Sequence, residues 1–429
     1  MTSETGLRMY GWARDLFPIC RSITGNGVRE TLAYLKKNVP EMVVHEVPSG
    51  SKAFDWTIPD EWNIRDAYIL DPSGERVVDF RASNLHVVGY SEPIDRTMPL
   101  DELQQHLHSL PDRIDTIPYV TSYYQRAWGF CLTHRVRQAL RPGDYRVVID
   151  STLSPGSLSY GEIILLGQSA EEIFLSTYVC HPSMANNELS GPVVVAALAQ
   201  WLAGLTDRKY TYRLIFIPET IGSITYLSRN LDHLKRHMVA GFNVTCIGDD
   251  RTYSYLASRA DNTVADRVAK HVLVHWAPGY RTYSFLQRGS DERQYCAPGV
   301  DLPVASIMRS RYGDYPEYHT SEDDLSVISP EGLSGGYEVL RRCLLGLEGN
   351  ETLRPTVLCE PQLGRRNLIS NLGYGPAQMG QFRRNLSNLL AYCDGTRDLI
   401  EVAELIGEPV WTLFESVAIL KREGLLRLL

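Results

Sequence analysis

The 429-residue sequence has no long apolar run and no excess of basic residues. No stretch approaches the roughly 18 uninterrupted apolar residues of a membrane-spanning helix, so we expect no membrane partner. The net charge of −8 argues against nucleic acid as a partner, because binding phosphates requires a basic face. The N-terminus lacks the charged-then-apolar pattern of a secretory signal, and we therefore expect a cytoplasmic protein.

The eight cysteines are scattered singly, and no Cys-x-x-Cys pair occurs among them. This spacing indicates neither a zinc ribbon nor a disulfide framework, and most of the cysteines are expected to be small buried side chains. The sequence also lacks internal repeats and low-complexity tracts. Its 44% hydrophobic and 22% charged residues are typical of a folded protein, with room for two or three domains.

The pattern of apolar residues and turn signals differs between three parts of the chain, which predicts three domains. Short alternating runs separated by turn signals predict a β-rich inserted domain over residues 41–155. Around it, over 1–40 and 156–350, strands alternate with helices and predict an α/β catalytic domain of three layers with a mainly parallel sheet. Three short helical units then predict a small all-α, winged-helix domain over 351–429.

The third helix of the C-terminal domain begins with acidic and apolar residues, and its basic residues Lys421 and Arg422 come only at its end. A helix that reads DNA would present basic or amide side chains to the groove. We therefore expect this domain to serve docking or oligomerisation, and a homo-oligomer could form through it or through the inserted domain. A winged-helix regulator is the less favoured alternative.

The inserted domain contains a dense group of aromatic residues. We expect them to pack in its core and on edge strands, with a wall of the substrate pocket as the alternative. The members are Tyr119, Tyr123, Tyr124, Trp128 and Phe130.

One segment of the α/β region organises the functional interpretation. An apolar strand, 173–179, leads directly into Cys180-His181-Pro182, and Glu188 follows shortly before a long apolar helix. Open α/β sheets bind ligands at the carboxyl ends of their strands, so this position suits a metal ligand. A histidine considered alone more often caps a loop than binds a ligand.

Further acids and a second histidine follow the other predicted strands. Two histidines and several carboxylates at one sheet edge form the ligand set that zinc prefers, so the sequence predicts a metal site. An additional carboxylate beside the metal is what activation of a water molecule requires. The residues are Glu219, Asp249, Asp250, Asp291, Glu292 and His319.

Arginines and tyrosines close in sequence to these groups are candidates for substrate binding. Arginine can grip a carboxylate or phosphate with two hydrogen bonds, and a tyrosine hydroxyl can support an oxyanion. Surface salt bridges are at least as good an explanation for each arginine. The substrate-binding candidates are Asn187, Asp291, Arg293, Arg309, Arg311, Tyr312 and Tyr318.

The order of these motifs resembles that of the M28-type zinc aminopeptidases. The matching segments are His181, Asn187–Gly191, Glu219–Ser223, Gly248–Asp250, Ser290–Asp291 and His319–Asp324. The phrases Cys180–Gly191 and Pro316–Ser321 most resemble the aminopeptidase-like group with DUF2172 and DUF4910 domains and a C-terminal winged helix. The resemblance implies a fold of the zinc-aminopeptidase type.

The resemblance also implies hydrolysis of an amide or peptide bond in a small-molecule, aminoacyl or peptide substrate. Glu219 matches the general base of the family. Asn187 replaces the metal-bridging aspartate, and threonines at 220 and 245 replace two further acids. We therefore expect one zinc ion, held by His181, His319 and a single carboxylate, with an open position for water.

Glu188 is the first choice for that carboxylate, with Asp249 or Asp250 next. The missing acids also leave a second function open, namely a metal-binding or ligand-binding protein that has lost peptidase activity. The choice depends on whether Asn187 or Glu188 faces His181.

Overall fold

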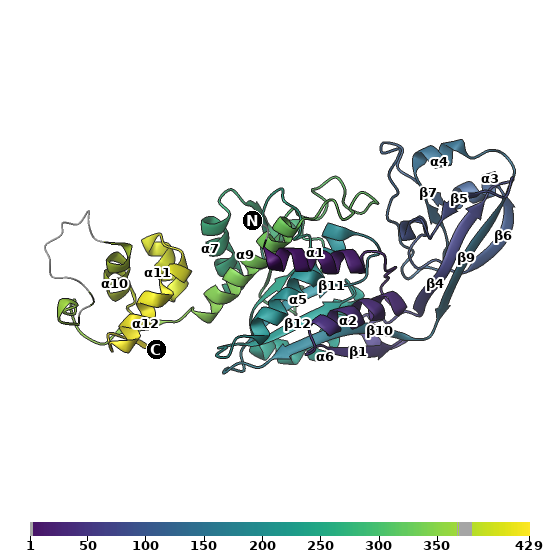
Figure 1. Ribbon diagram of the computed structural model, residues 1–429. Helices are drawn as coiled ribbons and strands as arrows, with labels where there is room; N and C mark the ends of the chain where they lie inside the picture. The colour runs from purple at the N-terminus through teal and green to yellow at the C-terminus, as the bar shows by residue number, and fades with distance from the viewer. Residues whose placement is uncertain (1–2, 367, 369–379) are drawn as a thin grey trace. The chain divides into compact units, whose positions relative to one another are not determined.

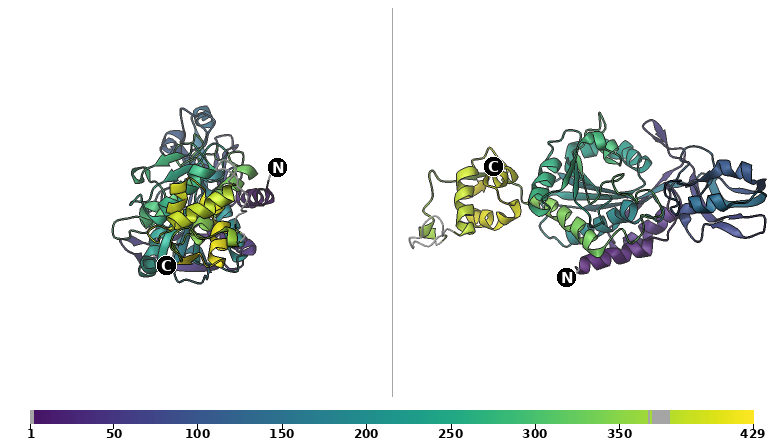
Figure 2. Two further views of the ribbon diagram at one scale, coloured as in Figure 1. Left: turned by 90° about the vertical axis from the view of Figure 1, so that its left-hand side faces the viewer. Right: turned by 90° about the horizontal axis from the view of Figure 1, so that it is seen from above.

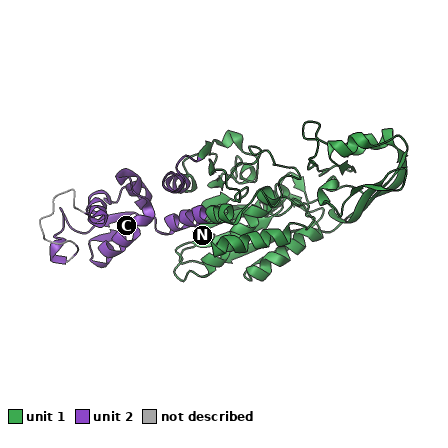
Figure 3. Ribbon diagram, turned by 45° about the horizontal axis from the view of Figure 1, so that its top comes forward, with its two compact units in different colours: residues 1–266, 281–337 green, residues 267–280, 338–429 purple. Residues whose placement is uncertain are grey.

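The computed structural model describes residues 3–366, 368 and 380–429. The chain forms two compact units (Figure 3), the first comprising residues 1–266 and 281–337 and the second 267–280 and 338–429. In the described ranges, no helix is both long enough and apolar enough to cross a membrane.

The first unit is built on an eight-stranded sheet of order β1-β10-β12-β11-β13-β16-β14-β15. Its four central strands run parallel, β1 and β10 pair antiparallel with their neighbours, and β14 pairs antiparallel with β16 and parallel with β15. Every residue of β11 and β12 is buried, as expected for parallel strands covered on both faces. The strands are β1 (Val43–Pro48), β10 (Ser157–Leu165), β11 (Glu172–Tyr178), β12 (Thr211–Ile217), β13 (Met238–Asn243), β14 (Ser254–Leu256), β15 (Arg281–Tyr283) and β16 (Val304–Met308).

Helices cover the sheet and complete the predicted three-layer α/β fold (Figures 1 and 2). Helix α5 (Ser190–Ala203) is buried almost throughout, because it packs on β11 and is itself covered by α1 (Glu4–Leu16) and α2 (Asn26–Asn38). This explains why its sequence is apolar on all sides. Helix α6 (Ile221–His237) packs on the sheet through Tyr226, whose ring lies 6.3 Å from that of Phe174 in β11.

A four-stranded antiparallel sheet of order β5-β4-β9-β6 lies within the range expected to be β-rich. It has an apolar core of its own that includes Ala67, Ile69, Val78, Phe130 and Val147. The first strand of that range, β1, pairs instead with β10 and belongs to the large sheet. The strands of the small sheet are β4 (Glu61–Leu70), β5 (Arg76–Asp79), β6 (Ile94–Pro99) and β9 (Asp144–Ser154).

In its described part, the second unit contains three complete α-helices, the C-terminal parts of two more and a short antiparallel strand pair. Asp398 caps the second helix in a capping box with Glu401, and Gly407 ends it in the left-handed conformation. The last strand pairs antiparallel with the strand that precedes the three complete helices, so the two ends of this segment are joined in one small sheet. The elements are β17 (Leu353–Pro355), α10 (Gln381–Tyr392), α11 (Leu399–Ile406), α12 (Phe414–Arg422) and β18 (Leu426–Leu428), together with the C-terminal parts of α7 (Val264–Trp276) and α9 (Pro330–Glu348).

Candidate active site

The loop after β11 carries His181 and leads into one turn of π-helix, Ala185–Leu189, before α5 begins. The backbone N–H groups of Asn186 and Asn187 donate to the two carboxylate oxygens of Asp323, at 2.7 and 2.9 Å. Gly191 lets α5 approach the sheet, since a Cβ atom there would lie 2.4 Å from the Val244 carbonyl oxygen. Turns of π-helix are frequent at functional sites because they redirect side chains.

Glu188 contacts His181 on the Nδ1 side of the imidazole. Its Oε2 lies 2.9 Å from Nδ1, and its Oε1 lies 3.5 Å from Nε of the fully buried Arg21. The same Nε of Arg21 donates to the His181 carbonyl oxygen at 2.8 Å. An arginine, a glutamate and a histidine thus form a buried chain that fixes the orientation of the ring.

The electrostatics of this chain favour a neutral imidazole. Burial lowers the pKa of His181 to about 3. Burial raises the pKa of Glu188, and the neighbouring Arg21 guanidinium opposes that rise by favouring the ionised carboxylate. An ionised Glu188 accepts a hydrogen bond from Nδ1–H, which leaves the lone pair of His181 on Nε2.

On its Nε2 side, His181 faces Glu219 and lies near His319. The Nε2 atom is 3.7 Å from Oε2 of Glu219, and the two imidazole rings are 5.4 Å apart. Nε2 of His319 and Oδ1 of Asn187 are both buried, and neither has a hydrogen-bond partner in the described part of the chain. Imidazole nitrogen and carboxamide oxygen atoms are ligand types that suit a divalent metal ion.

A second group of potential ligand atoms comes from Cys180, His181 and Glu188, which lie within 4.8 Å of one another. A cation bound there would displace the hydrogen bond between His181 Nδ1 and Glu188. It would also lie close to the Arg21 guanidinium, which repels it. The Nε2 side of His181 is therefore the more favourable position for a metal.

A strained turn at the start of α6 positions Glu219. Thr220 adopts φ 63° and ψ −76°, and the N–H of Ile221 donates to the Glu219 carbonyl at 2.8 Å, which defines a rare left-handed γ-turn. Asp291 Oδ1 accepts from the Thr220 N–H at 2.7 Å, and Arg293 donates to the Thr220 hydroxyl at 3.0 Å. Burial and the charge of Asp291 raise the pKa of Glu219, as suits a proton acceptor.

Three tyrosines pack around the two histidines. The ring of Tyr318 stacks on His319 at 3.9 Å, and Tyr178 lies 5.2 Å from His181. Tyr119 lies 5.3 Å from His181 and 5.1 Å from His319, and its N–H donates to the His319 carbonyl at 3.0 Å. Since Tyr119 comes from the expected β-rich range, that range contributes a side chain to the site.

Asp249 and Asp250, the alternative metal ligands, are engaged by other groups. Both carboxylate oxygens of buried Asp249 accept hydrogen bonds, from the side chain of Asn186 and from the backbone and hydroxyl of Ser310. Exposed Asp250 accepts from the hydroxyl of Ser329. These contacts fix the loop after β13 and do not bring either acid to His181.

Three of the substrate-binding candidates are likewise committed elsewhere. Arg309 packs over the ring of Tyr253 at 4.0 Å, and Arg311 pairs with Asp314 at 2.5 Å. The hydroxyl of buried Tyr312 donates to a glutamate at 2.6 Å. The candidates that contact His319 or the turn after Glu219 are Asp291, Arg293 and Tyr318. The side-chain oxygen of Asn187 is buried and has no hydrogen-bond partner in the described part of the chain.

The sequence interpretation missed Arg21 altogether. No motif points to it, because it lies 160 residues from His181 and precedes an unremarkable glycine-containing turn. Tyr119 was predicted only as one member of an aromatic group, expected in the core with a wall of the substrate pocket as the alternative. In both cases the contact depends on tertiary structure that local spacing does not encode.

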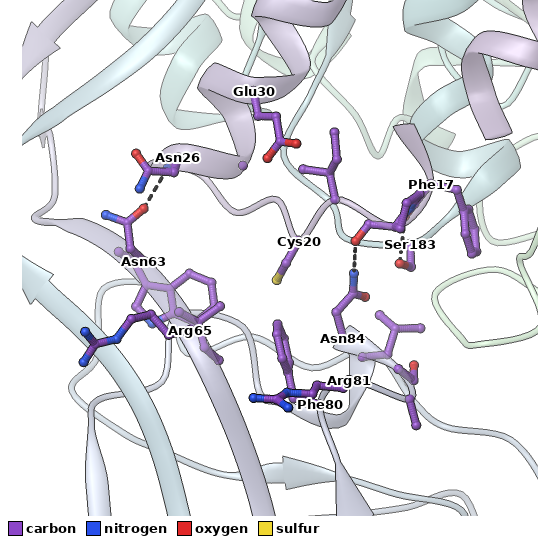
Figure 4. A pocket seen from close by; sticks show the side chains of 18 of the residues that line it. Phe17, Cys20, Asn26, Glu30, Asn63, Arg65, Phe80, Arg81, Asn84 and Ser183 are labelled. Atoms are coloured by element: carbon purple, nitrogen blue, oxygen red, sulfur yellow. Dashed lines mark hydrogen bonds between the residues drawn. The ribbon is translucent and has the colours of Figure 1, made fainter. Parts of the chain in front are cut away.

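A cavity of about 730 Å³ adjoins the loop of His181 (Figure 4). It contains aromatic, amide and charged side chains, and its wall includes Ser183, two residues after His181. The hydroxyl of Ser183 donates to the Phe17 carbonyl at 2.9 Å, which ties this wall to the N-terminal segment. His181, Glu219 and His319 are not part of the lining.

Comparison with known proteins identifies both parts of the chain. The family described as a domain of unknown function, DUF4910, matches residues 10–350, and a winged helix-turn-helix family matches residues 351–428. A relative from Clostridium acetobutylicum, provisionally named a polysaccharide biosynthesis protein with an aminopeptidase-like domain, is 44% identical over 429 residues, covering 100% of this chain and 98% of the relative.

Solved structures place this fold among the aminopeptidases. A crystal structure from C. acetobutylicum, provisionally described as a peptidase, has 44% identity and a TM-score of 0.93, covering 100% of this chain and 97% of that chain. A zinc aminopeptidase from Bacillus subtilis has 13% identity and a TM-score of 0.57, covering 80% and 95%. An M28 peptidase precursor from Shewanella amazonensis has 14% identity and a TM-score of 0.55, covering 79% and 91%. The chain therefore belongs to the DUF4910 family, an aminopeptidase-like group with the fold of the M28 zinc aminopeptidases and a C-terminal winged helix.

Proposed function

We propose that this protein is a metal-dependent hydrolase of an amide or peptide bond. One observation carries the proposal. The rings of buried His181 and half-buried His319 lie 5.4 Å apart, Nε2 of His319 has no hydrogen-bond partner among the described residues, and the Glu219 carboxylate lies 3.7 Å from Nε2 of His181. Metal ligands beside a carboxylate that can accept a proton are the requirements for hydrolysis by an activated water molecule.

Zinc is the metal that these residues would hold, through Nε2 of His181, Nε2 of His319 and Oδ1 of Asn187. A bound zinc ion lowers the pKa of water and polarises a carbonyl group. This ligand set differs from the one expected from the sequence, since Glu188 contacts Nδ1 of His181 and pairs with Arg21. Glu188 is thus a group that orients a ligand.

The protein side chains divide the remaining work. Glu219 accepts a proton from the attacking water and delivers it to the leaving amine, which its raised pKa favours. Its side chain keeps 22% exposure, so water and substrate reach it. Arg21 and Glu188 hold the imidazole of His181, and Tyr119 and Tyr318 pack against the histidines and limit the access of further water.

The substrate class is an amide, and three kinds deserve a test. The aminopeptidase-like fold suggests peptides and aminoacyl conjugates. The provisional name of the C. acetobutylicum relative refers to polysaccharide biosynthesis, which adds N-acylated amino sugars. A cytoplasmic location and a homo-oligomer formed through the inserted or the winged-helix domain stay predictions.

The experiment combines metal content with turnover on a panel of these amides. We expect about one zinc ion per chain, hydrolysis of at least one amide class, and loss of hydrolysis on chelation or in Glu219→Gln. Protein that binds no metal, or activity that survives both chelator and Glu219→Gln, would exclude the proposal.

A specific observation supports an alternative in which the protein binds a metal or ligand without hydrolysis. Asn187 and Thr245 stand where the M28-type pattern has acids, and they contact each other, since the Thr245 hydroxyl donates to the Asn187 carbonyl at 3.0 Å. Under this alternative, purified protein binds one zinc ion and hydrolyses none of the panel. Turnover by protein with one zinc ion would dispose of it.

A further inference from the structure

Among the described residues, the hydrogen bonds of Arg293 go only to uncharged acceptors. Its Nε donates to the Ser290 carbonyl at 2.9 Å and its Nη2 to the Thr220 hydroxyl at 3.0 Å. Both acceptors are uncharged, and the side chain is only half-buried. Its described contacts therefore orient the guanidinium group without neutralising its charge.

Two neighbouring arginines pair with acids: Arg21 lies 3.5 Å from the Glu188 carboxylate, and Arg311 lies 2.5 Å from Asp314. Arg309 instead donates to the Thr252 carbonyl and packs over the ring of Tyr253. The Arg293 guanidinium is held by neutral acceptors and is only partly removed from water, which prepares it to bind an anion with two hydrogen bonds.

Arg293 also lies beside the proposed proton acceptor. The hydroxyl that it contacts belongs to Thr220, the residue directly after Glu219. The charge of Arg293 is near enough to oppose the rise in the pKa of Glu219 and of Tyr318. All four side chains retain some exposure, so a bound anion would sit next to the reacting amide.

The acids at the site offer little to a substrate ammonium group. Glu219 is assigned to proton transfer. Asp291 uses Oδ1 to accept hydrogen bonds from Thr220 and Ser223, and its Oδ2 has no hydrogen-bond partner in the described part of the chain but lies on a fully buried residue that a substrate cannot reach. Glu188 is paired with Arg21. A substrate anion can reach the partly exposed Arg293, whereas a free amino terminus meets acids that are buried, paired or assigned to proton transfer.

We infer that Arg293 is a substrate-binding residue that pairs with a carboxylate or phosphate group adjacent to the hydrolysed amide. This inference rests on the proposed function and specifies its substrate class. The substrates would be acidic amides, such as an N-acyl amino acid with a free carboxylate or an N-acylated sugar phosphate.

Binding of matched probes tests the inference without relying on turnover. Calorimetry on zinc-loaded Glu219→Gln protein would compare N-acetylalanine with N-acetylalaninamide, and N-acetylglucosamine 1-phosphate with N-acetylglucosamine. We expect the anionic member of one pair to bind about 10- to 100-fold more tightly than its neutral partner, as charged hydrogen bonds allow. The pair that shows this difference identifies the anion as carboxylate or phosphate.

Variants of Arg293 in the same background decide whether this side chain is responsible. Arg293→Gln should abolish the difference between anionic and neutral probes, and Arg293→Lys should retain part of it. Arg311→Gln should preserve it, because Arg311 is paired with Asp314. Zinc content and thermal midpoint, measured for each variant, show that folding is intact.

Three results would overturn the inference: equal affinity within both pairs, no binding of either anionic probe, or a difference that survives Arg293→Gln. Failure of the proposed function looks different. If the wild-type protein binds an anionic probe through Arg293 but hydrolyses no amide, the proposed hydrolase activity is wrong and the anion subsite stands. If it hydrolyses the neutral amides faster than the anionic ones, the anion subsite is wrong and the hydrolase activity stands.

Discussion

The two sides of the His181 ring have opposite characters. On the Nδ1 side, Glu188 and Arg21 are fully buried and their opposite charges lie 3.5 Å apart, although Oε1 of Glu188 and Nη2 of Arg21 make no hydrogen bond in the described part of the chain. On the Nε2 side, Glu219 keeps 22% side-chain exposure and lies 3.7 Å from Nε2, and the neighbouring His319 has an Nε2 atom without a described partner.

The Nδ1 side therefore orients the His181 ring, and the Nε2 side is available to a ligand. A buried pair of opposite charges holds the ring in place but offers no free group for a reaction. A buried polar atom without a partner costs free energy unless a ligand binds to it. Glu188, the carboxylate that the sequence favoured as a metal ligand, lies on the Nδ1 side. Asn187, which replaces the metal-bridging aspartate of the M28-type pattern, has a side-chain oxygen that is proposed as a metal ligand.

The largest expected effect is a loss of turnover, caused by a substitution on the Nε2 side. Glu219→Gln removes the proton acceptor while leaving the proposed metal ligands in place. We expect turnover to fall by about 10²- to 10⁴-fold, with zinc content unchanged. Steady-state kinetics on the best amide of the panel, with metal analysis of the same sample, measure both. A parallel loss of metal would instead assign Glu219 to the ligand set.

The next largest effect is a loss of folding stability, which is expected from a change on the Nδ1 side. Arg21→Met leaves the Glu188 carboxylate buried without its cation, which should lower the free energy of unfolding by about 3–5 kcal/mol. Urea unfolding of the single variant and of Arg21→Met with Glu188→Gln measures the coupling. The double variant should recover part of the loss, whereas additive losses would show that the pair is not coupled.

A smaller effect should follow from changing Glu188 alone. Glu188→Gln weakens the contact that orients His181, and such outer contacts usually contribute about 10- to 100-fold to metal affinity. Competition with a chromogenic chelator would measure the zinc dissociation constant. If Glu188 were itself a ligand, the loss should instead match that of His181→Ala.

These contrasts also show what the sequence could predict. The strand-end rule predicted that His181 and Glu219 lie close together, and they do, because β11 and β12 are adjacent parallel strands whose ends meet. His319 reaches the same place from the loop that follows β16. The alternation of strands and helices and the helical C-terminal region were recognisable from periodicity alone. Long apolar segments fix these features locally.

Other features were out of reach for physical reasons. The π-helical turn at 185–189 decides which way Asn187 and Glu188 point, and an assumed period of 3.6 cannot reveal it. Strand β13 ends at Asn243, earlier than its apolar pattern predicts, so Asp249 falls deeper into a loop than expected. Arg21 reaches His181 only through tertiary folding.

The smallest expected effect concerns a buried histidine that serves structure alone. In the second unit, Nε2 of His271 accepts from the Val410 N–H at 2.9 Å, and burial lowers its pKa from 6.5 to about 4. Above pH 6.5 the imidazole of His271 is neutral in both the folded and the unfolded state, so His271 adds no pH dependence to the free energy of unfolding. Between pH 6.5 and 4 the unfolded state binds a proton that the folded state does not, so stability falls as pH falls, by up to about 2 kcal/mol.

Denaturant unfolding as a function of pH, compared with His271→Gln, checks this expectation. Carboxylates titrate in both proteins, so the difference between them isolates His271. The difference should grow as the pH falls from 6.5 and level off below 4. A difference that does not vary with pH would contradict the assignment of a neutral buried imidazole.

Anomalous diffraction at the zinc absorption edge, on crystals of zinc-loaded protein, tests the central claim most directly. The account predicts one peak per chain, at about 2.0–2.1 Å from Nε2 of His181 and of His319, with Glu188 still hydrogen-bonded to Nδ1. A peak on the Nδ1 side, coordinated by Cys180 or Glu188, would contradict it, as would the absence of any peak.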